Sequence, residues 1–178
     1  MRGLPTRLVP RLVALVVAAS LLAGCGRDKS DDKPNIQANG TDMAFATDML
    51  DHHERGIDAA DLALSRAEDR VIRRSAQDLI QLQSSEAQVL RANRRALSEG
   101  GVEESDLGVP QTTLDPAELR AADDFDAAYA AAMIAHHEKA IRMAAIERRK
   151  GVHAGLLSMT GDITDLARFQ IRQLERRR

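Results

Sequence analysis

The chain has 178 residues, of which 44% are hydrophobic and 29% charged, and its formal net charge at neutral pH is −2. The single cysteine excludes an internal disulfide framework, so a folded domain has to depend on its apolar core. The charge balance shows no basic excess of the kind that favours nucleic-acid binding, and we expect no nucleic-acid partner.

The N-terminal segment, residues 1–24, has the pattern of a lipoprotein signal peptide. Three arginines precede an apolar run at residues 12–22, and the sequence Leu-Ala-Gly-Cys that ends at Cys25 resembles the bacterial lipoprotein box. The apolar run is too short to favour a membrane-spanning helix. We therefore expect export, lipidation of Cys25 and anchoring to the cell membrane on its extracytoplasmic side. The alternative is an ordinary cleaved signal with an incidental cysteine, which also places the protein outside the cytoplasm.

Residues 25–40 are polar and charged and lack apolar periodicity, which predicts a flexible tether behind the lipidated cysteine. Loss of the signal peptide removes three arginines and no acid, and takes the formal net charge to about −5. Residues 41–178 then fit a single domain that the tether holds off the membrane.

Helix formers dominate this domain and helix breakers gather at a few places, which predicts an all-α fold. The first helix should run over about 42–65 behind Thr41 as N-cap, and the second over about 70–97 behind Asp69. The connection over 100–114 is long enough to cross the length of a helical bundle, although the sequence does not decide whether it does.

The third helix should run without a break from Pro116 towards Lys150, because Asp115 and Glu118 can form a capping box at its start. A fourth helix should run from about His153 to the C-terminus. Each helix carries a stripe of Leu, Ile, Ala and Met, and four such helices predict a four-helix bundle.

The two halves of the domain repeat one pattern. A shift of 84 residues lays His52-His53 over His136-His137 without a gap, and these are four of the five histidines. The same shift matches four further pairs: Asp42 with Asp126, Phe45 with Tyr129, Met49 with Met133, and Glu54 with Glu138. Repeats over 42–98 and 126–178 therefore predict that one helical hairpin has been duplicated.

The histidine dipeptides flank the stripe that each helix is expected to bury. At ~100° per residue, His52 and His53 lie on either side of the position of Met49, and the second repeat reproduces this arrangement. Neutral imidazole binds late first-row metals and the soft thioether of methionine suits Cu(I), so copper, as Cu(I) or Cu(II), is the expected metal. The candidate metal ligands all lie along this stripe in the two repeats: Met49, His52, His53, Met133, His136, His137 and Met143.

A purely structural histidine cluster is the alternative to a metal site, because buried histidine with a hydrogen-bond partner is common and methionine often fills a core. Two adjacent polar rings beside a buried stripe cost free energy unless they find partners or a metal, and the repetition favours the metal. A di-iron carboxylate site is excluded, because no Glu-x-x-His pair is present. Glu54 and Glu138 rotate towards solvent, whereas the small Gly56 and Ala140 leave space near the rings.

Other polar residues near the stripe are weaker candidates. Asp42 and Asp126 could support the site by orienting a histidine of the opposite hairpin, although an acid favoured by the helix dipole would explain Asp42. Gln83 and Glu86 lie at i and i+3 on the second helix, but the repeat does not reproduce them, so a polar role there would belong to one half only. His153 is expected to be structural or solvated.

Together these residues resemble a known family, the bacterial domain of unknown function 305, whose pattern is Asp-x-x-Phe-x-x-x-Met-x-x-His-His-x-x-Ala-x-x-Met-Ala. Both repeats are similar to it, from about Asp42 onward. The resemblance implies a ferritin-like four-helix bundle that is often exported, and some members are periplasmic copper-binding proteins that use Met and His. The chain departs from the pattern at Tyr129, Gly56 and Ala59, which leaves stoichiometry and affinity open.

Three functions follow from these patterns. The first is a non-enzymatic, membrane-anchored protein that binds copper and either buffers it or hands it over to a metal-handling or membrane-protein partner. The second is a structural or interaction module without a metal. The third, ranked last, is a metal-dependent redox enzyme, for which the sequence offers no nucleophile and no cofactor fingerprint.

Overall fold

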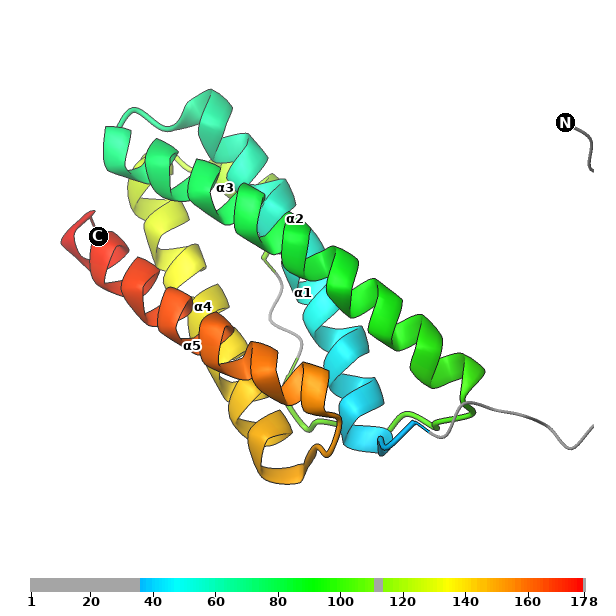
Figure 1. The fold of residues 1–178 in the computed structure, drawn as a ribbon. Helices are drawn as coiled ribbons and strands as arrows, with labels where there is room; N and C mark the ends of the chain where they lie inside the picture. The colour runs from blue at the N-terminus through cyan, green and yellow to red at the C-terminus, as the bar shows by residue number, and fades with distance from the viewer. Residues whose placement is uncertain (1–35, 111–113, 178) are drawn as a thin grey trace, which may run out of the picture. The chain divides into compact units, whose positions relative to one another are not determined.

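The computed structural model describes residues 36–110 and 114–177, and within these ranges every regular element is a helix (Figure 1). The helices are α1 (Gly40–Arg66), α2 (Arg70–Glu99), α3 (Pro116–Ala121), α4 (Phe125–Lys150) and α5 (Ala154–Leu174), followed by a 3₁₀ turn, η1 (Glu175–Arg177). The all-α prediction is therefore confirmed. The expected signal peptide, Cys25 and the expected tether up to residue 35 lie outside the described residues. None of the described helices is long and apolar enough to cross a membrane.

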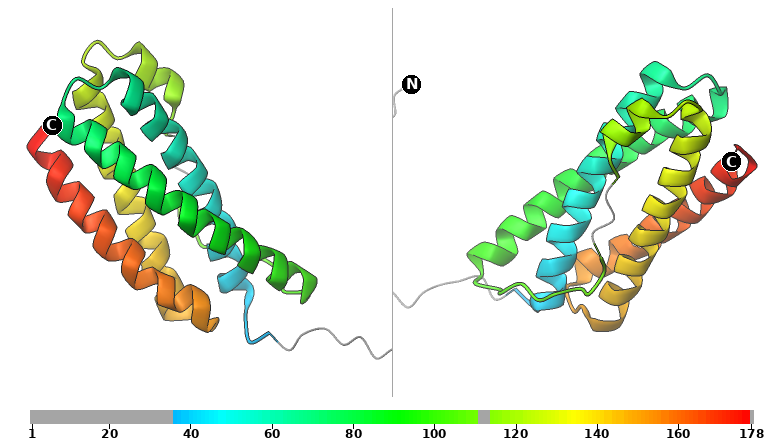
Figure 2. Two further views of the ribbon diagram at one scale, coloured as in Figure 1. Left: turned by 45° about the horizontal axis from the view of Figure 1, so that its top comes forward. Right: turned by 180° about the vertical axis from the view of Figure 1, so that it is seen from behind.

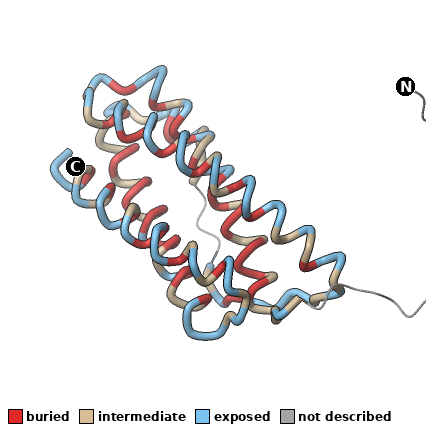
Figure 3. The backbone as a smooth tube through the Cα atoms, in the orientation of Figure 1, coloured by how far each residue is buried: buried red, intermediate tan, exposed pale blue. Residues whose placement is uncertain are grey.

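The long helices pair as two hairpins, α1 with α2 and α4 with α5, and α1 packs against α4 (Figure 2). Buried residues line the sides of the helices that face one another (Figure 3). This pairing is what the sequence repeat predicts, because each repeat supplies one hairpin and each hairpin leaves an apolar stripe that needs a partner.

Most of the predicted helix ends are confirmed. The Asp69 carboxylate accepts from the backbone N–H groups of Val71 and Ile72, and Asp115 caps α3 through the N–H of Ala117. The N-cap of α1 is Asn39, not Thr41, since the Asn39 side chain accepts from Thr41 N and Asp42 N in a capping box.

The prediction of one unbroken helix from Pro116 to Lys150 is wrong. The chain leaves α3 at Ala122, whose backbone is extended, and begins α4 at Phe125. Asp124 explains the restart, because its side chain accepts from Ala127 N and so replaces the helical partner that this N–H would otherwise need. The local hydrogen bond of an aspartate thus overrides the helix propensity of its neighbours.

Two apolar clusters form the core, and their members show that α1 and α4 run antiparallel. One cluster joins the first half of α1 to the second half of α4, and the other joins the second half of α1 to the first half of α4. The large members of the first include Phe45, Met49, Leu90, Leu97, Met143 and Leu156, and those of the second Ile72, Leu79, Tyr129, Met133 and Leu174. Both histidine dipeptides fall between the two clusters along their helices.

The connection between the hairpins contacts both clusters. Leu107 is buried in the first cluster, and Ser105 N donates to Gly40 O at the start of α1. Leu119, in α3, is buried in the second cluster, with Leu114 packed against it. The connection therefore crosses from one apolar cluster to the other, which the sequence had left open.

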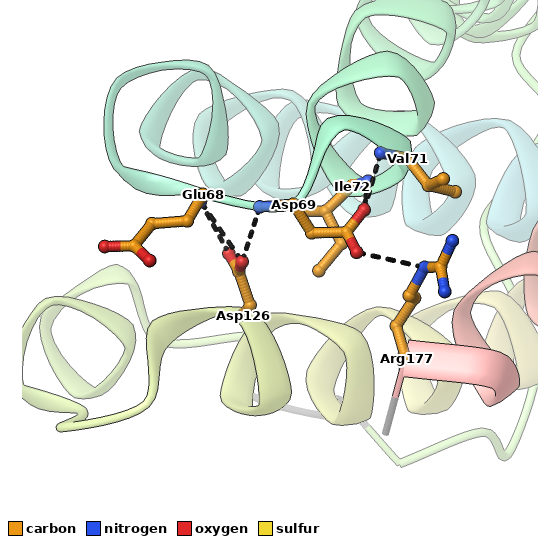
Figure 4. A network of polar contacts seen from close by, with 6 residues as sticks. All are labelled: Glu68, Asp69, Val71, Ile72, Asp126 and Arg177. Carbon is orange, nitrogen blue, oxygen red and sulfur yellow. Dashed lines mark hydrogen bonds and ion pairs between the residues drawn. The ribbon is translucent and has the colours of Figure 1, made fainter.

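Two aspartates link the hairpins to each other. Each lies at the start of one hairpin and accepts hydrogen bonds from the turn that joins the two helices of the other hairpin. Asp126, in the first turn of α4, accepts from the backbone N–H groups of Glu68 and Asp69 between α1 and α2, at 3.1 and 2.7 Å (Figure 4). Its repeat partner Asp42, in the first turn of α1, accepts from Val152 and His153 N–H between α4 and α5, at 2.9 and 2.8 Å. The two contacts are equivalent under the 84-residue shift.

These contacts correct the role that we expected for Asp42 and Asp126. Neither carboxylate orients a ring of the histidine dipeptides, because each is occupied by backbone donors at the end of the opposite hairpin. An unbroken helix from Pro116 would have placed Asp126 well inside that helix, whereas the break before α4 puts it in a first turn, where the helix dipole favours an acid.

The Asp42 contact differs from the equivalent Asp126 contact in one buried group. Glu147, on α4, is fully buried beside Asp42, and burial together with the neighbouring Asp42 carboxylate raises the pKa of Glu147 to about 8. A protonated Glu147 can donate to Asp42, which already accepts backbone N–H groups. In the first repeat the equivalent position is Ala63, so this second carboxyl exists at one end only.

Substitution of Asp126 tests the tie between the hairpins. We expect Asp126→Ala to lower the free energy of unfolding by about 1–2 kcal/mol, because the N–H groups of Glu68 and Asp69 lose a charged acceptor. Urea unfolding followed by circular dichroism measures this. Asp123→Ala, which removes an exposed acid three residues away, is the control. Equal stability of the two variants would contradict the role of Asp126.

Candidate metal centre

The structure brings the two histidine dipeptides together across the interface between α1 and α4. His52, His53, His136 and His137, which we name the histidine cluster, are exposed by only 4%, 1%, 4% and 2%. The rings of His52 and His136 stack face to face, with centroids 3.6 Å apart and planes 8° from parallel. The two copies of the repeated motif therefore form one buried group and not two separate ones.

Burial keeps the rings of His52, His136 and His137 uncharged. The pKa values of His52 and His136 lie well below the ordinary value for histidine, chiefly because burial disfavours the charged ring, and the neighbouring imidazoles and Lys139 act in the same direction. The pKa of His137 falls to about 4, again mainly through burial. These three imidazoles are neutral at pH 7, and a neutral imidazole has the lone pair that a metal ligand needs.

Helix α2 supplies two polar neighbours of the cluster. Glu86 Oε2 lies 2.8 Å from His53 Nε2, and Gln83 Nε2 lies 3.5 Å from His136 Nε2. From the sequence these two residues are weak candidates, because the second repeat lacks them. The signal that could have identified them is their i, i+3 spacing on the face of α2 that has to meet α1.

Gly56 makes room for one of the stacked rings. A Cβ at this position would lie 2.7 Å from His136 Nε2 and 2.5 Å from Gln83 Oε1, distances that real Cβ atoms do not reach. The expectation that Gly56 leaves space near the rings is confirmed, and the ring that uses the space belongs to the opposite hairpin.

Four nitrogen atoms of the cluster are buried without a hydrogen-bond partner: His52 Nε2, His53 Nδ1, His53 Nε2 and His137 Nε2. A buried polar atom without a partner costs free energy, so such atoms need a compensating role. Late first-row metals take neutral imidazole nitrogen readily, and the residues present fit copper in this respect.

The described residues do not form a complete metal site from His, Cys, Asp and Glu side chains alone, because no group of three or more of them converges. The stacked pair explains this in part. The lone pairs of an imidazole lie in the plane of its ring, so two parallel rings at 3.6 Å direct their nitrogens along separate planes. A further ligand type, or a change in the stacking, is needed to enclose an ion.

The candidate methionines are all fully buried in the apolar core. Met49 and Met143 belong to the first apolar cluster and Met133 to the second. Met49 lies one turn before His52, and Met133 one turn before His136, on antiparallel helices. Thioethers therefore flank the histidine cluster on both sides.

The remaining candidates lie away from the cluster. Glu54 and Glu138 are exposed, as expected, and Glu54 pairs with Arg91 at 2.7 Å. His153 is the N-cap of α5, where its Nδ1 accepts from Leu156 N at 3.3 Å. The structural role expected for His153 is confirmed.

A family model described as Domain of unknown function (DUF305) matches residues 42–178. Among solved structures, CopM in the Cu(I)-bound form is 25% identical, with a TM-score of 0.65 over 76% of this chain and 93% of that chain. CopM in the apo form is 24% identical, with a TM-score of 0.66 over 76% and 93% of the two chains. A DUF305 fragment from Deinococcus radiodurans is 22% identical, with a TM-score of 0.63 over 78% and 95%. No curated protein matches the chain.

Alanine at position 56 tests whether the histidine cluster needs the glycine. The clash with His136 and Gln83 should cost about 1–3 kcal/mol, which exceeds the gain of ~1 kcal/mol in helix propensity. Gly161→Ala is the matched control, because Gly161 is exposed within α5 and a Cβ there meets nothing within 4 Å. Urea unfolding should show Gly56→Ala destabilised and Gly161→Ala stabilised. A stabilised Gly56→Ala variant would disprove the close approach of His136.

Proposed function

Because the chain belongs to the DUF305 family, we propose that its histidine cluster is a copper site and that the protein binds and buffers copper. The observation that carries the proposal is the cluster itself: four buried imidazoles, with nitrogen atoms that lack a hydrogen-bond partner, brought together from both repeats. Solved structures of CopM in Cu(I)-bound and Cu(II)-bound forms support copper as the metal.

The residues that would hold the ion are the candidate ligands predicted from the sequence. They are Met49, His52 and His53 from α1 with Met133, His136, His137 and Met143 from α4. Imidazole and thioether together match Cu(I), and hard cations such as Mg²⁺ and Ca²⁺ prefer oxygen ligands that this group lacks. Buffering requires only that these soft ligands bind copper, and it requires no reaction at the metal.

The neutral state of the rings suits this function. Burial lowers the pKa values of His52, His136 and His137, so protons compete weakly with a metal at these rings near pH 7. The apolar clusters on either side exclude water from the rings. A dry site with neutral ligands favours a soft monovalent cation over strongly hydrated divalent ones.

We also infer the finer organisation of the protein. The two hairpins correspond to a ferritin-like four-helix bundle made of α1, α2, α4 and α5. Residues 1–24 would be a lipoprotein signal peptide and residues 25–40 a tether with lipidated Cys25, so that the domain is anchored outside the cytoplasm. The pattern of basic, apolar and small residues before Cys25 supports this arrangement.

A Cu(I) competition titration tests the function. The protein from residue 27 onward is titrated against a chromophoric Cu(I) chelator, beside a variant with His52, His53, His136 and His137 all replaced by Ala. Loss of a residue that only supports a metal ligand lowers metal affinity about 10–100-fold. We expect the Cu(I) affinity of the quadruple variant to fall further, because the ligands themselves are lost. His153→Ala, which removes a histidine outside the cluster, should bind as the parent does.

Circular dichroism of the quadruple variant separates loss of binding from loss of folding. A folded quadruple variant that binds copper as tightly as the parent would contradict the copper site and leave a structural bundle. Weak binding by the parent itself would do the same.

A further inference from the structure

Glu86 is the carboxylate that α2 brings to the histidine cluster. Its Oε2 lies 2.8 Å from His53 Nε2, and its side chain is only 12% exposed. Of the arginines that follow Glu86 on α2, Arg91 pairs with Glu54 and Arg95 pairs with Glu99 on the surface. Glu86 therefore faces the histidine ring and not a surface cation.

The short distance bears on which nitrogen of His53 carries the proton. If Nε2 were the unprotonated nitrogen, its partial negative charge would lie 2.8 Å from a negatively charged carboxylate oxygen, which is repulsive. A proton on Nε2 turns the same contact into an attraction. The N–H is not aligned with the oxygen well enough for a hydrogen bond, so the attraction is the electrostatic one between the N–H and the carboxylate.

The other ring nitrogen, Nδ1, then carries the lone pair that can bind a metal. His53 Nδ1 is buried and has no hydrogen-bond partner. Ligand histidines commonly donate their second ring N–H to a carboxylate, which fixes the tautomer and raises the basicity of the ligating nitrogen. The Glu86–His53 pair has the composition of such an arrangement.

The second repeat lacks this carboxylate. Gln170 occupies the position equivalent to Glu86, is buried, and donates through its amide to Ser75 O at 3.4 Å. His137, the equivalent of His53, is left with a buried Nε2 that has no hydrogen-bond partner. The two halves of the cluster therefore have the same histidine rings but different polar neighbours.

We propose that Glu86 is a positioning residue that holds His53 in the Nε2–H tautomer and leaves Nδ1 free to bind the metal, so that the first repeat supplies the stronger half of the site. The tautomer follows from the geometry of the metal-free protein. The statement about binding strength rests on the proposed copper function.

The test uses the ¹⁵N-labelled, metal-free protein at pH 7, in which long-range ¹H–¹⁵N correlations of the imidazole rings identify the protonated nitrogen. The variants are Glu86→Gln, which keeps the shape and removes the charge, and Glu54→Gln, which makes the same change at an exposed residue beside His53 in the sequence. We expect His53 to be protonated at Nε2 in the parent and in Glu54→Gln, and to show a mixture of tautomers in Glu86→Gln.

A Cu(I) titration of the same three proteins gives the second measurement. Glu86→Gln should weaken binding about 10-fold and Glu54→Gln should leave it unchanged. A parent whose His53 carries its proton at Nδ1, or at both nitrogens, would overturn the proposal, as would a Glu86→Gln variant with the tautomer and affinity of the parent. If the parent shows the expected tautomer but no protein binds copper, the positioning role of Glu86 stands and the copper function fails.

Discussion

The face-to-face contact of His52 and His136 is the interaction on which the rest of the structure depends. It places two polar rings in the middle of the α1–α4 interface, between two apolar clusters that would otherwise form one continuous core. Such a layer is tolerated only where the helices approach closely and partners are supplied from outside, and Gly56 and Glu86 meet these two needs. A core built for stability alone would hold apolar side chains at these positions.

Duplication explains how this layer is assembled and why its halves differ. The equivalent carboxylates of Asp42 and Asp126 tie each hairpin to the other's connection, so the helices that carry the histidines are held in register at both ends. The residues around this framework differ between the repeats. Glu147 is buried beside Asp42 and has no equivalent beside Asp126, and Glu86, which contacts His53, has no equivalent carboxylate beside His137. The shared framework is thus symmetric and its polar environment is not.

Much of this arrangement could be predicted from the sequence. The 84-residue repeat identified the hairpins and the histidine dipeptides, because apolar periodicity and a repeated motif are local signals. The break before Phe125 was missed because the hydrogen bond from Ala127 N to Asp124 competes with strong helix formers. The role of Asp126 was missed because its partners lie in the turn of the other hairpin, 57 residues away for Asp69, and no spacing along the chain encodes such a contact. The i, i+3 spacing of Gln83 and Glu86 indicates a shared face of α2 but not which ring that face meets.

The central claim is that the metal lies within the histidine cluster, at the interface of the two repeats. Anomalous diffraction at the copper absorption edge, from crystals of the Cu(I)-loaded protein, locates the ion directly. We predict a peak within bonding distance of imidazole nitrogens from both α1 and α4, with the stacked pair of His52 and His136 rearranged to direct a nitrogen at it. A peak only at the surface, with the stacking of His52 and His136 unchanged, would contradict the account.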